Sequence, residues 1–331
     1  MSTSTLNDDA TVARASRVRL HEYSLAAAVE LSTQPCASFP ASLHETPGAT
    51  RIIDLNLSKD LDVPYAATSP NLLAQFIVLN SGESITTSTR STSQAFFVLR
   101  GNGATSSVAH GRIEWAQGDL IVLPALSGEL EHTAAASTSN NSAALYAICD
   151  EPLLRYLGVS ASESRFGAAF YGRKVLLDAV ETIRHEPGAE HRNRMGILLS
   201  NEAMSETKTL TPVLWALLNV LPAHTKQPPH RHQSVAIDLC VSIGSGAEGL
   251  VYTMMGPELD DQGWVKNPIK MNWTSSSVFT TPPGWWHSHH NESDSDAWVL
   301  PTQDAGLYTH QRTLNIQFSH AKPMAAGSGG K

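Results

Sequence analysis

The stretch TPPGWWHSHHNES, residues 281–293, contains three histidines within four positions, directly after two tryptophans and a Pro-Pro-Gly turn. A second window upstream, KQPPHRHQS at residues 226–234, contains two more. Together the two windows hold five of the fourteen histidines of the chain. This clustering indicates ligands of one metal ion. The alternative is a set of unrelated histidines, each satisfied by ordinary hydrogen bonds.

The residues that follow the upstream window alternate in character. From His230 onward the sequence HRHQSVAIDLCVSI has branched apolar residues at the odd positions 235–243 and histidines, then small or polar residues, at the even positions. A period of two predicts a strand with one apolar face and one face that lines a pocket. Two histidines at i and i+2 have Cβ atoms about 6–7 Å apart, so His230 and His232 can reach one ion. A third ligand must come from another strand, and His287 and His289 repeat the same spacing.

Most of the remaining chain consists of apolar runs of strand length that end in glycine or asparagine, such as QAFFVLRGNG and GDLIVLPALSG. Their spacing is typical of an all-β sandwich or barrel. Residues 152–184 instead show helical spacing, and Pro152 suits the first turn of a helix. We therefore predict two β domains with a helical connector. The predicted boundaries are an extension at 1–50, β domains at 51–150 and 206–320, a helical linker at 151–205 and a flexible tail at 321–331.

Composition restricts the classes of partner. The net charge of -8 and the pI of about 5.9 argue against nucleic acid and anionic membranes. No apolar run reaches the roughly 18 residues that span a bilayer, and the N-terminal sequence lacks the apolar segment of a secretory signal. The three cysteines show no pairing pattern. Free thiols in a reducing compartment, and hence a cytoplasmic location, are expected.

The downstream window fits a known motif. Pro282, Gly284, His287 and Asn291 match P-x-G-x-x-H-x-x-x-N, the second motif of the cupin superfamily, and HRH matches the core of the first. The segments PPHRHQSVA and PGWWHSHHN resemble the gentisate and salicylate 1,2-dioxygenase branch of the bicupins. The resemblance implies two cupin domains, each a jelly-roll β-barrel.

This resemblance also implies a ligand set. The branch uses three histidines and no glutamate, and Ala236 stands where many cupins carry the glutamate ligand. By resemblance His230, His232 and His287 bind the metal, and His289 is an acid/base or substrate-contacting residue beside it. For His289 the alternative is that it only orients His287 or fills space. The implied metal is Fe(II), with Mn, Ni and Zn left open by the ligand type.

The first β domain keeps the cupin outline without the histidines. In GESITTSTRSTSQAFFVLRG the two ligand positions are occupied by Ser88 and Arg90, and the glutamate position by Gln94. Further on, Glu129 stands where the third ligand is expected. The usual enzymes of the branch carry iron in the N-terminal cupin, so this chain departs from them. We predict metal in the second domain alone.

Four residues are the predicted substrate contacts. Where the branch has an arginine, this chain has Asp238, which cannot hold a substrate carboxylate. Asp238 could accept from a hydroxyl or amino substituent, pair with Arg312, or be a buried carboxyl held by its own hydrogen bonds. Trp285 shares the ligand face and could contact an aromatic ring, although core packing is an equal alternative. Gln233 completes the set.

The combined prediction is an Fe(II)-dependent extradiol-type dioxygenase. It would insert O₂ between the carboxyl- and hydroxyl-bearing carbons of a substituted salicylate, for which 5-nitrosalicylate is one substrate known in the family. Two alternatives stay open: another metal-dependent bicupin enzyme, such as a decarboxylase or isomerase of a small acid, and a ligand-binding cupin without chemistry. The apolar face at 235–243 needs a cover, so a homo-oligomer, a dimer or tetramer, is also expected.

Overall fold

The computed structural model describes residues 8–27, 32–137, 142–322 and 324–325. The chain forms two compact units, Met1–Thr33 and Gln34–Lys331. The first unit contains two short helices, α1 (Asp8–Ala15) and α2 (Tyr23–Ala26). The second unit contains all the sheets. No helix within the described residues is long and apolar enough to cross a bilayer.

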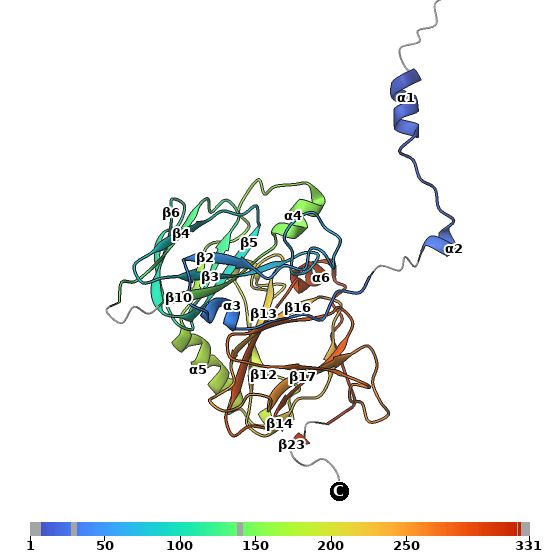
Figure 1. Ribbon diagram of the computed structural model, residues 1–331. Helices are drawn as coiled ribbons and strands as arrows, with labels where there is room; N and C mark the ends of the chain where they lie inside the picture. The colour runs from blue at the N-terminus through green and yellow to red at the C-terminus, as the bar shows by residue number, and fades with distance from the viewer. Residues whose placement is uncertain (1–7, 28–31, 138–141, 323, 326–331) are drawn as a thin grey trace, which may run out of the picture. The chain divides into compact units, whose positions relative to one another are not determined.

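Two antiparallel sheets form the N-terminal half of the second unit (Figure 1). The six-stranded sheet has the order β11-β8-β5-β10-β3-β2. Its strands are β2 (Arg51–Asp54), β3 (Leu73–Leu79), β5 (Ser93–Arg100), β8 (Leu120–Pro124), β10 (Ala143–Cys149) and β11 (Ala169–Tyr171). The four-stranded sheet has the order β4-β9-β6-β7. Its strands are β4 (Ser84–Thr87), β6 (Asn102–Ser107), β7 (Gly111–Ala116) and β9 (Leu130–Ala134).

The C-terminal half repeats this plan with a second pair of sheets. The six-stranded sheet, in the order β1-β19-β16-β21-β13-β12, consists of β1 (Ser38–Phe39), β12 (Met195–Leu199), β13 (Trp215–Leu221), β16 (Ala236–Ser242), β19 (Val278–Thr281) and β21 (Ala297–Gln303). The facing sheet consists of β14 (Thr225–Lys226), β15 (His230–Arg231), β17 (Val251–Gly256), β18 (Ile269–Asn272), β20 (Trp286–Asn291), β22 (Gln317–Phe318) and β23 (Met324–Ala325). The helices of this unit are α3 (Ser42–Glu45), α4 (Glu151–Leu157), α5 (Arg173–Arg184) and α6 (Ala305–Gln311).

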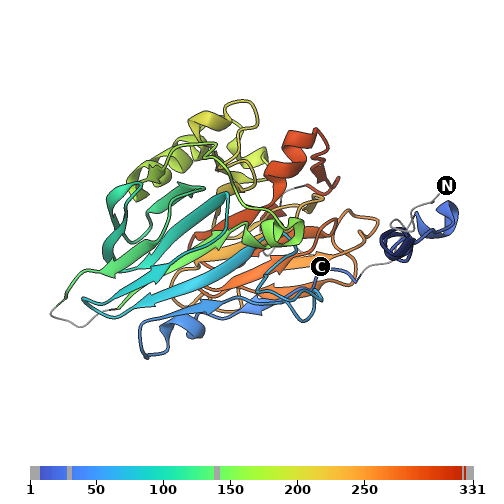
Figure 2. The same ribbon diagram turned by 90° about the horizontal axis from the view of Figure 1, so that it is seen from above.

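Alternating side chains bind the four sheets into one stack. In β10, Tyr146 and Ile148 belong to the hydrophobic cluster between the two six-stranded sheets. Leu145 and Ala147 point the other way, into the cluster beneath the four-stranded sheet. A third cluster, which includes Trp273, fills the C-terminal half. Each half is thus an open sandwich rather than a closed barrel. Figure 2 shows the long blue-to-green strands of one half lying over the orange strands of the other.

The strand predicted from residue 230 onward is divided in the structure. β15 ends at Arg231 and belongs to the sheet of β20, whereas β16 begins at Ala236 in the six-stranded sheet. Between them the chain crosses from one sheet to the other. The backbone N–H of Val235 donates to the Asp304 carboxylate there, in place of a neighbouring strand. The prediction of one continuous strand is therefore wrong, although the alternation of its two faces persists on both sides of the break.

The apolar face of this segment is covered within the chain. Val235, Ile237 and Leu239 lie in the central cluster together with Phe76 and Tyr146 of the N-terminal half. A partner sheet of the same unit therefore covers the face that led us to expect a second subunit. The homo-oligomer stays a prediction without this support.

The predicted helical linker contains more than helices. Pro152 lies in the first turn of α4, as expected, and α5 follows. The same segment also supplies β11 to one six-stranded sheet and β12 to the other. In the predicted flexible tail, β23 pairs with β14, and residues 323 and 326–331 lie outside the described residues.

We expect the central cluster to carry much of the stability. Leu239→Ala removes a fully buried side chain from it and should lower the free energy of unfolding by about 2–5 kcal/mol. Leu198 of β12 is 45% exposed, and Leu198→Ala should change that free energy by less than about 0.5 kcal/mol. Urea unfolding of both variants measures the difference. Equal losses would contradict the layered arrangement.

Candidate metal centre

Three histidines of the predicted ligand set lie together in the C-terminal half. β15 pairs with β20 so that His230 is directly opposite His287. The ring centroids are 4.1 Å apart for His230 and His287, and that of His232 lies 5.5 Å and 5.0 Å from them. One ligand nitrogen from each ring lies within 4.8 Å of the other two. Side chains this close could share a metal ion.

Backbone carbonyls orient two of the imidazoles. Nδ1 of His232 lies 2.9 Å from the carbonyl oxygen of Ser234, and Nδ1 of His287 lies 3.1 Å from that of Trp285. A carbonyl only accepts, so each Nδ1 carries the proton and each Nε2 keeps a lone pair. Nε2 of His232 is buried and has no hydrogen-bond partner in the part of the chain that the structure describes. A buried nitrogen lone pair beside two further imidazoles fits a metal ligand.

His230 has a different partner. Its Nδ1 contacts Nη2 of Arg194, the residue directly before β12. A guanidinium can only donate, so this contact uses the Nδ1 lone pair of His230, and Arg194 has to leave that nitrogen when His230 binds a metal. Nη1 of Arg194 donates to the carbonyls of Asn193 and Pro228. Carbonyl groups thus hold a positive charge beside the three histidines.

Burial keeps the histidines uncharged at neutral pH. It lowers the pKa of His232 to about 4 and those of His230 and His287 well below the usual range, and the positive charge of Arg194 adds to each shift. Burial also lowers the pKa of Arg194 to about 9, so its guanidinium stays mainly protonated at neutral pH. Neutral imidazole is the form that binds a metal, and the adjacent guanidinium favours an anion.

The remaining two histidines of β20 lie on opposite faces of the strand. His289 faces inward, with its ring centroid 5.9 Å from that of His287 and its Nδ1 2.9 Å from Oγ1 of Thr253. His290 faces the other side and stacks on Tyr252 at a centroid distance of 4.9 Å. The side chains therefore alternate as the strand pattern predicts. His290 does not belong to the cluster.

Asp238 is buried and has a local partner. Its Oδ2 accepts a hydrogen bond of 2.7 Å from the hydroxyl of Thr281. Burial raises its pKa to about 7, against the lowering by that hydrogen bond and by Arg194. The pairing of Asp238 with Arg312 is not found within the described residues. Arg312 is exposed and donates to the carbonyl of His310.

Of the other two predicted substrate contacts, Trp285 packs inside the C-terminal half and Gln233 lies at the surface. Trp285 packs against the hydrophobic cluster of the C-terminal half. The following residue, Trp286, lies beneath the guanidinium of Arg231. Gln233 is exposed, donates to the carbonyl of Thr313 and accepts from the N–H of Asn315. It thereby holds the loop after α6. Contact of Trp285 or Gln233 with a substrate stays a prediction.

Comparison with known proteins identifies the fold. No protein-family model matches the chain, and no curated protein matches it. The salicylate 1,2-dioxygenase of Pseudaminobacter salicylatoxidans aligns over 96% of this chain and 99% of its own, at 14% identity and a TM-score of 0.66. A tryptophan-to-tyrosine variant of that enzyme in complex with gentisate aligns over 96% of both chains, at 13% identity and a TM-score of 0.68. The chain has a bicupin fold.

A second kind of bicupin also matches. An oxalate decarboxylase aligns over 83% of this chain and 78% of its own, at 12% identity and a TM-score of 0.53. At such identities the likeness concerns the fold. The predicted all-β fold class with two jelly-roll cupin domains is confirmed, although each half is an open sandwich and not the barrel that we predicted.

Strand register identifies the residues that replace the ligands in the N-terminal cupin half. Thr87 of β4 pairs with Leu130 of β9, as His230 of β15 pairs with His287 of β20. Thr87 and Leu130 are both buried. A threonine and a leucine therefore stand where the C-terminal half has two imidazoles.

This register corrects part of the sequence alignment. Ser88, Arg90 and Glu129 are exposed, so they do not occupy the ligand positions assigned to them. The N-terminal half is one residue longer at two places: between Thr87 and Gln94, compared with His230 to Ala236, and between Pro124 and Leu130, compared with Pro282 to His287. The first difference displaces the alignment at Ser88 and Arg90, and the second displaces it at Glu129. Gln94 is buried and pairs with Leu123, the residue before Pro124. Ala236 pairs in the same way with Thr281, the residue before Pro282, so Gln94 and Ala236 are equivalent positions.

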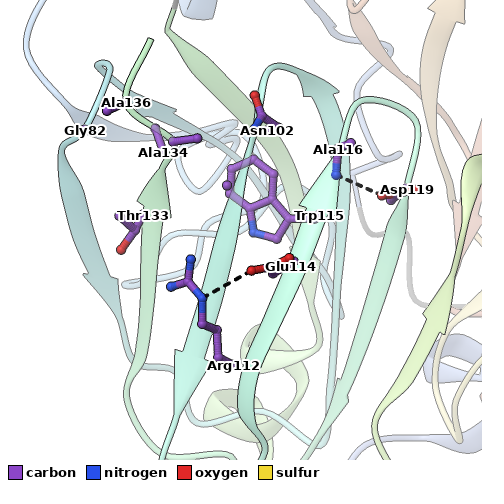
Figure 3. Close-up of a pocket in the computed structure, with 12 residues that line it drawn as sticks. Gly82, Asn102, Arg112, Glu114, Trp115, Ala116, Asp119, Thr133, Ala134 and Ala136 are labelled. Carbon is purple, nitrogen blue, oxygen red and sulfur yellow. Dashed lines mark hydrogen bonds and ion pairs between the residues drawn. The ribbon is translucent and has the colours of Figure 1, made fainter.

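The N-terminal half has a hollow of another kind. About 680 Å³ lies over its four-stranded sheet, lined by Trp115 and by polar residues of β7 (Figure 3). Arg112 and Glu114 form an exposed ion pair of 3.7 Å there. The carboxylate of Asp119 accepts from the N–H of Ala116. None of the clustered histidines lines this hollow.

Arg194 was not among the residues predicted from the sequence. It stands in RNRMGILLS, within the segment assigned to a helical linker, and no spacing connects it to either histidine window. The one local signal for it in the sequence is that this positive charge directly precedes the apolar run at residues 195–199. The contact depends on β12 pairing with β13, which brings the start of β12 to the histidines.

We expect one metal ion per chain, bound through the histidine cluster. His287→Ala should abolish tight Fe(II) or Zn(II) binding, because it removes one of three ligands. His290→Ala should keep it, since His290 faces the other side of the same strand. Because the ligand pKa values are lowered, protons compete weakly and binding should persist well below pH 6.5. Metal analysis after dialysis at several pH values tests both points. Equal metal content in the two variants would contradict the assignment.

Proposed function

We propose that the chain is a ring-cleaving dioxygenase for salicylate-type aromatic acids, with Fe(II) held by His230, His232 and His287. The observation that carries the proposal is the all-imidazole cluster. Within the described residues the cluster consists of three neutral imidazoles without a carboxylate, and a guanidinium lies close by. Its occurrence in a fold shared with a salicylate 1,2-dioxygenase supports the same reaction class.

Bound Fe(II) would supply open coordination positions at which a chelating aromatic acid and O₂ can meet. Arg194 takes the part of the carboxylate anchor in this proposal. Its guanidinium is already beside His230, and a carboxylate can receive two parallel hydrogen bonds from it. This resolves the difficulty posed by Asp238, which stands where the related enzymes have an arginine.

Asp238 has a separate part in the proposal. With a pKa near 7 it is partly protonated at neutral pH, so it can donate to or accept from a ring substituent. Trp285 packs against the hydrophobic cluster of the C-terminal half and can limit the space for the aromatic ring of the substrate. Together these residues favour a substituted salicylate as substrate, with O₂ as second substrate. Gln233 and Arg312, at the exposed loop after α6, complete the proposed substrate contacts.

One alternative has an observation in its favour. The likeness to an oxalate decarboxylase fits a metal-dependent reaction that releases CO₂ from a small acid. Ala236, which stands where a glutamate ligand would be, is buried and supplies no carboxylate. CO₂ release from a small dicarboxylic acid without O₂ uptake would favour this alternative.

Oxygen consumption tests the proposed reaction. Protein loaded with Fe(II) under exclusion of air should consume O₂ when salicylate, gentisate or 5-nitrosalicylate is added, in proportion to the acid converted. The loss of ring absorbance and the mass of the product should follow the same time course. A fully iron-loaded sample that consumes no O₂ with any of these acids would refute the proposal.

Replacement of Arg194 tests the anchor. Arg194→Met should raise the KM for salicylate about tenfold or more, because it removes a charge-assisted hydrogen bond to the carboxylate. It should leave metal binding intact or tighten it, since the positive charge beside the imidazoles is lost. Arg231→Met is the matched control, because Arg231 lies over Trp286 and donates to Gln317. A KM that is the same in both variants would contradict the role of Arg194.

A further inference from the structure

An arrangement of tryptophan, threonine and histidine occurs inside the C-terminal half. Nε1 of Trp273 donates to Oγ1 of Thr253 over 2.9 Å, and the same oxygen lies 2.9 Å from Nδ1 of His289. All three side chains are buried. The ring of Trp273 also meets that of His289 edge-on at a centroid distance of 5.3 Å.

The N-terminal half contains the same arrangement. Nε1 of Trp115 donates to Oγ1 of Thr105 over 3.1 Å, and that oxygen lies 2.9 Å from Nδ1 of His132. These three side chains are buried as well. We call the two arrangements the C-terminal relay and the N-terminal relay.

Strand register shows that the relays correspond residue by residue. His289 is the cross-strand partner of Thr253, and His132 is the cross-strand partner of Thr105. Each tryptophan lies opposite the residue two positions before its threonine. Trp115 is the cross-strand partner of Gly103, and the backbone N–H of Trp273 donates to the carbonyl of Val251. The relay therefore belongs to the plan of both halves and does not depend on a metal.

Donor and acceptor chemistry fixes the protons in the relay. An indole N–H can only donate, so the threonine oxygen accepts from the tryptophan. The threonine proton then needs an acceptor, and in each half the histidine Nδ1 is the partner within hydrogen-bond distance. If Nδ1 donated instead, a buried hydroxyl proton would be left without an acceptor, which is costly. Each histidine thus accepts at Nδ1 and keeps its proton on Nε2.

The two halves differ in what faces this Nε2–H. In the N-terminal half Nε2 of His132 lies 2.9 Å from Oγ1 of Thr87, which accepts the proton. Register puts His230 in the place of Thr87. For Nε2 of His289 no hydrogen-bond partner is found within the described residues, and the side chain is buried next to the three clustered histidines. The donor of the C-terminal relay therefore faces the candidate metal centre.

We propose that Thr253 and Trp273 are positioning residues that hold His289 as a hydrogen-bond donor, through Nε2–H, to an anionic oxygen of the bound aromatic acid. His289 then acts neither as a base nor as a fourth ligand, because its only free nitrogen carries a proton. The identity of the acid rests on the proposed function, whereas the position of the proton does not.

The first experiment locates the proton in the metal-free protein. Histidine side-chain ¹⁵N spectra near neutral pH should show His289 with a protonated Nε2, assigned by the loss of its signals in His289→Gln. Thr253→Val should shift His289 toward the other tautomer or a mixture. Thr105→Val removes the same hydroxyl from the N-terminal relay and should alter His132 alone. A protonated Nδ1 on His289 in the unmodified protein would overturn the proposal, whatever substrate the protein uses.

The second experiment asks whether the proton is donated. Salicylate binding to Fe(II)-loaded protein without O₂ is measured by calorimetry. His289→Leu and Thr253→Val should each weaken binding about tenfold, the usual effect of losing a hydrogen bond to a charged group. His289→Gln keeps an N–H donor without a basic nitrogen, and Thr253→Ser keeps the hydroxyl, so both should retain most of the affinity. Thr105→Val should bind as the unmodified protein does.

Two results separate the possible failures. If His289→Gln binds salicylate as weakly as His289→Leu, the donor role is wrong even though the site binds the acid. If the unmodified Fe(II)-loaded protein does not bind salicylate, the proposed substrate class is wrong, and the ¹⁵N spectra alone decide the state of His289. Equal loss of affinity in Thr253→Val and Thr105→Val would show that the relay acts through the stability of the fold, which also contradicts the proposal.

Discussion

The candidate site depends on one cross-strand pair, in which His230 of β15 lies directly opposite His287 of β20. β15 has two residues and is held on its other side by β22, where His230 pairs with Phe318. Side chains alternate along a strand, so a slip of one residue in this register would turn His230 to the outer face. His232 lies just beyond β15 and is held by its own bonds, from its Nδ1 to the carbonyl of Ser234 and from the N–H of Gly284 to its carbonyl.

The charges around this pair constrain what can bind. The three imidazoles are neutral, and the nearest full charge is the guanidinium of Arg194, held by carbonyls. A divalent cation placed here would add to a positive charge, which an anion must offset. An acid with both a carboxylate and a phenolate oxygen supplies two negative charges at chelating distance. Charge balance therefore supports the ligand class that we propose, on which Arg194 and the metal would act together.

The two halves show which features belong to folding and which to chemistry. Both contain the buried tryptophan–threonine–histidine relay, and both turn one six-stranded sheet toward the central cluster. They differ at the ligand positions, where Thr87 and Leu130 replace two imidazoles. In the N-terminal half the hydroxyl of Thr87 contacts His132 Nε2. The relay of the N-terminal half therefore ends in an internal hydrogen bond, whereas the C-terminal half leaves lone pairs and a donor directed at one place.

The fold class and the composition of the histidine cluster could be predicted from the amino-acid sequence. Period-two alternation and the motif around Pro282 and Gly284 are local properties, because a strand fixes which neighbours share a face. The alignment of the N-terminal half from sequence was wrong by one position at Ser88, Arg90 and Glu129, because two separate connections are each one residue longer there. A connection can gain a residue without altering the strands that it joins.

The residues that contact the site could not be predicted in the same way, because they come from strands that are distant in the chain. Arg194 reaches His230 because β12 joins the sheet next to β13, and Asp238 pairs with Thr281 of β19 and not with Arg312. The apolar face of residues 235–239 is likewise covered by strands that are distant in the chain. Local spacing determines which side chains share a face. How sheets pair and stack determines which strand faces pack together and which charged side chain lies beside the histidines. The spacing of neighbouring residues does not determine this.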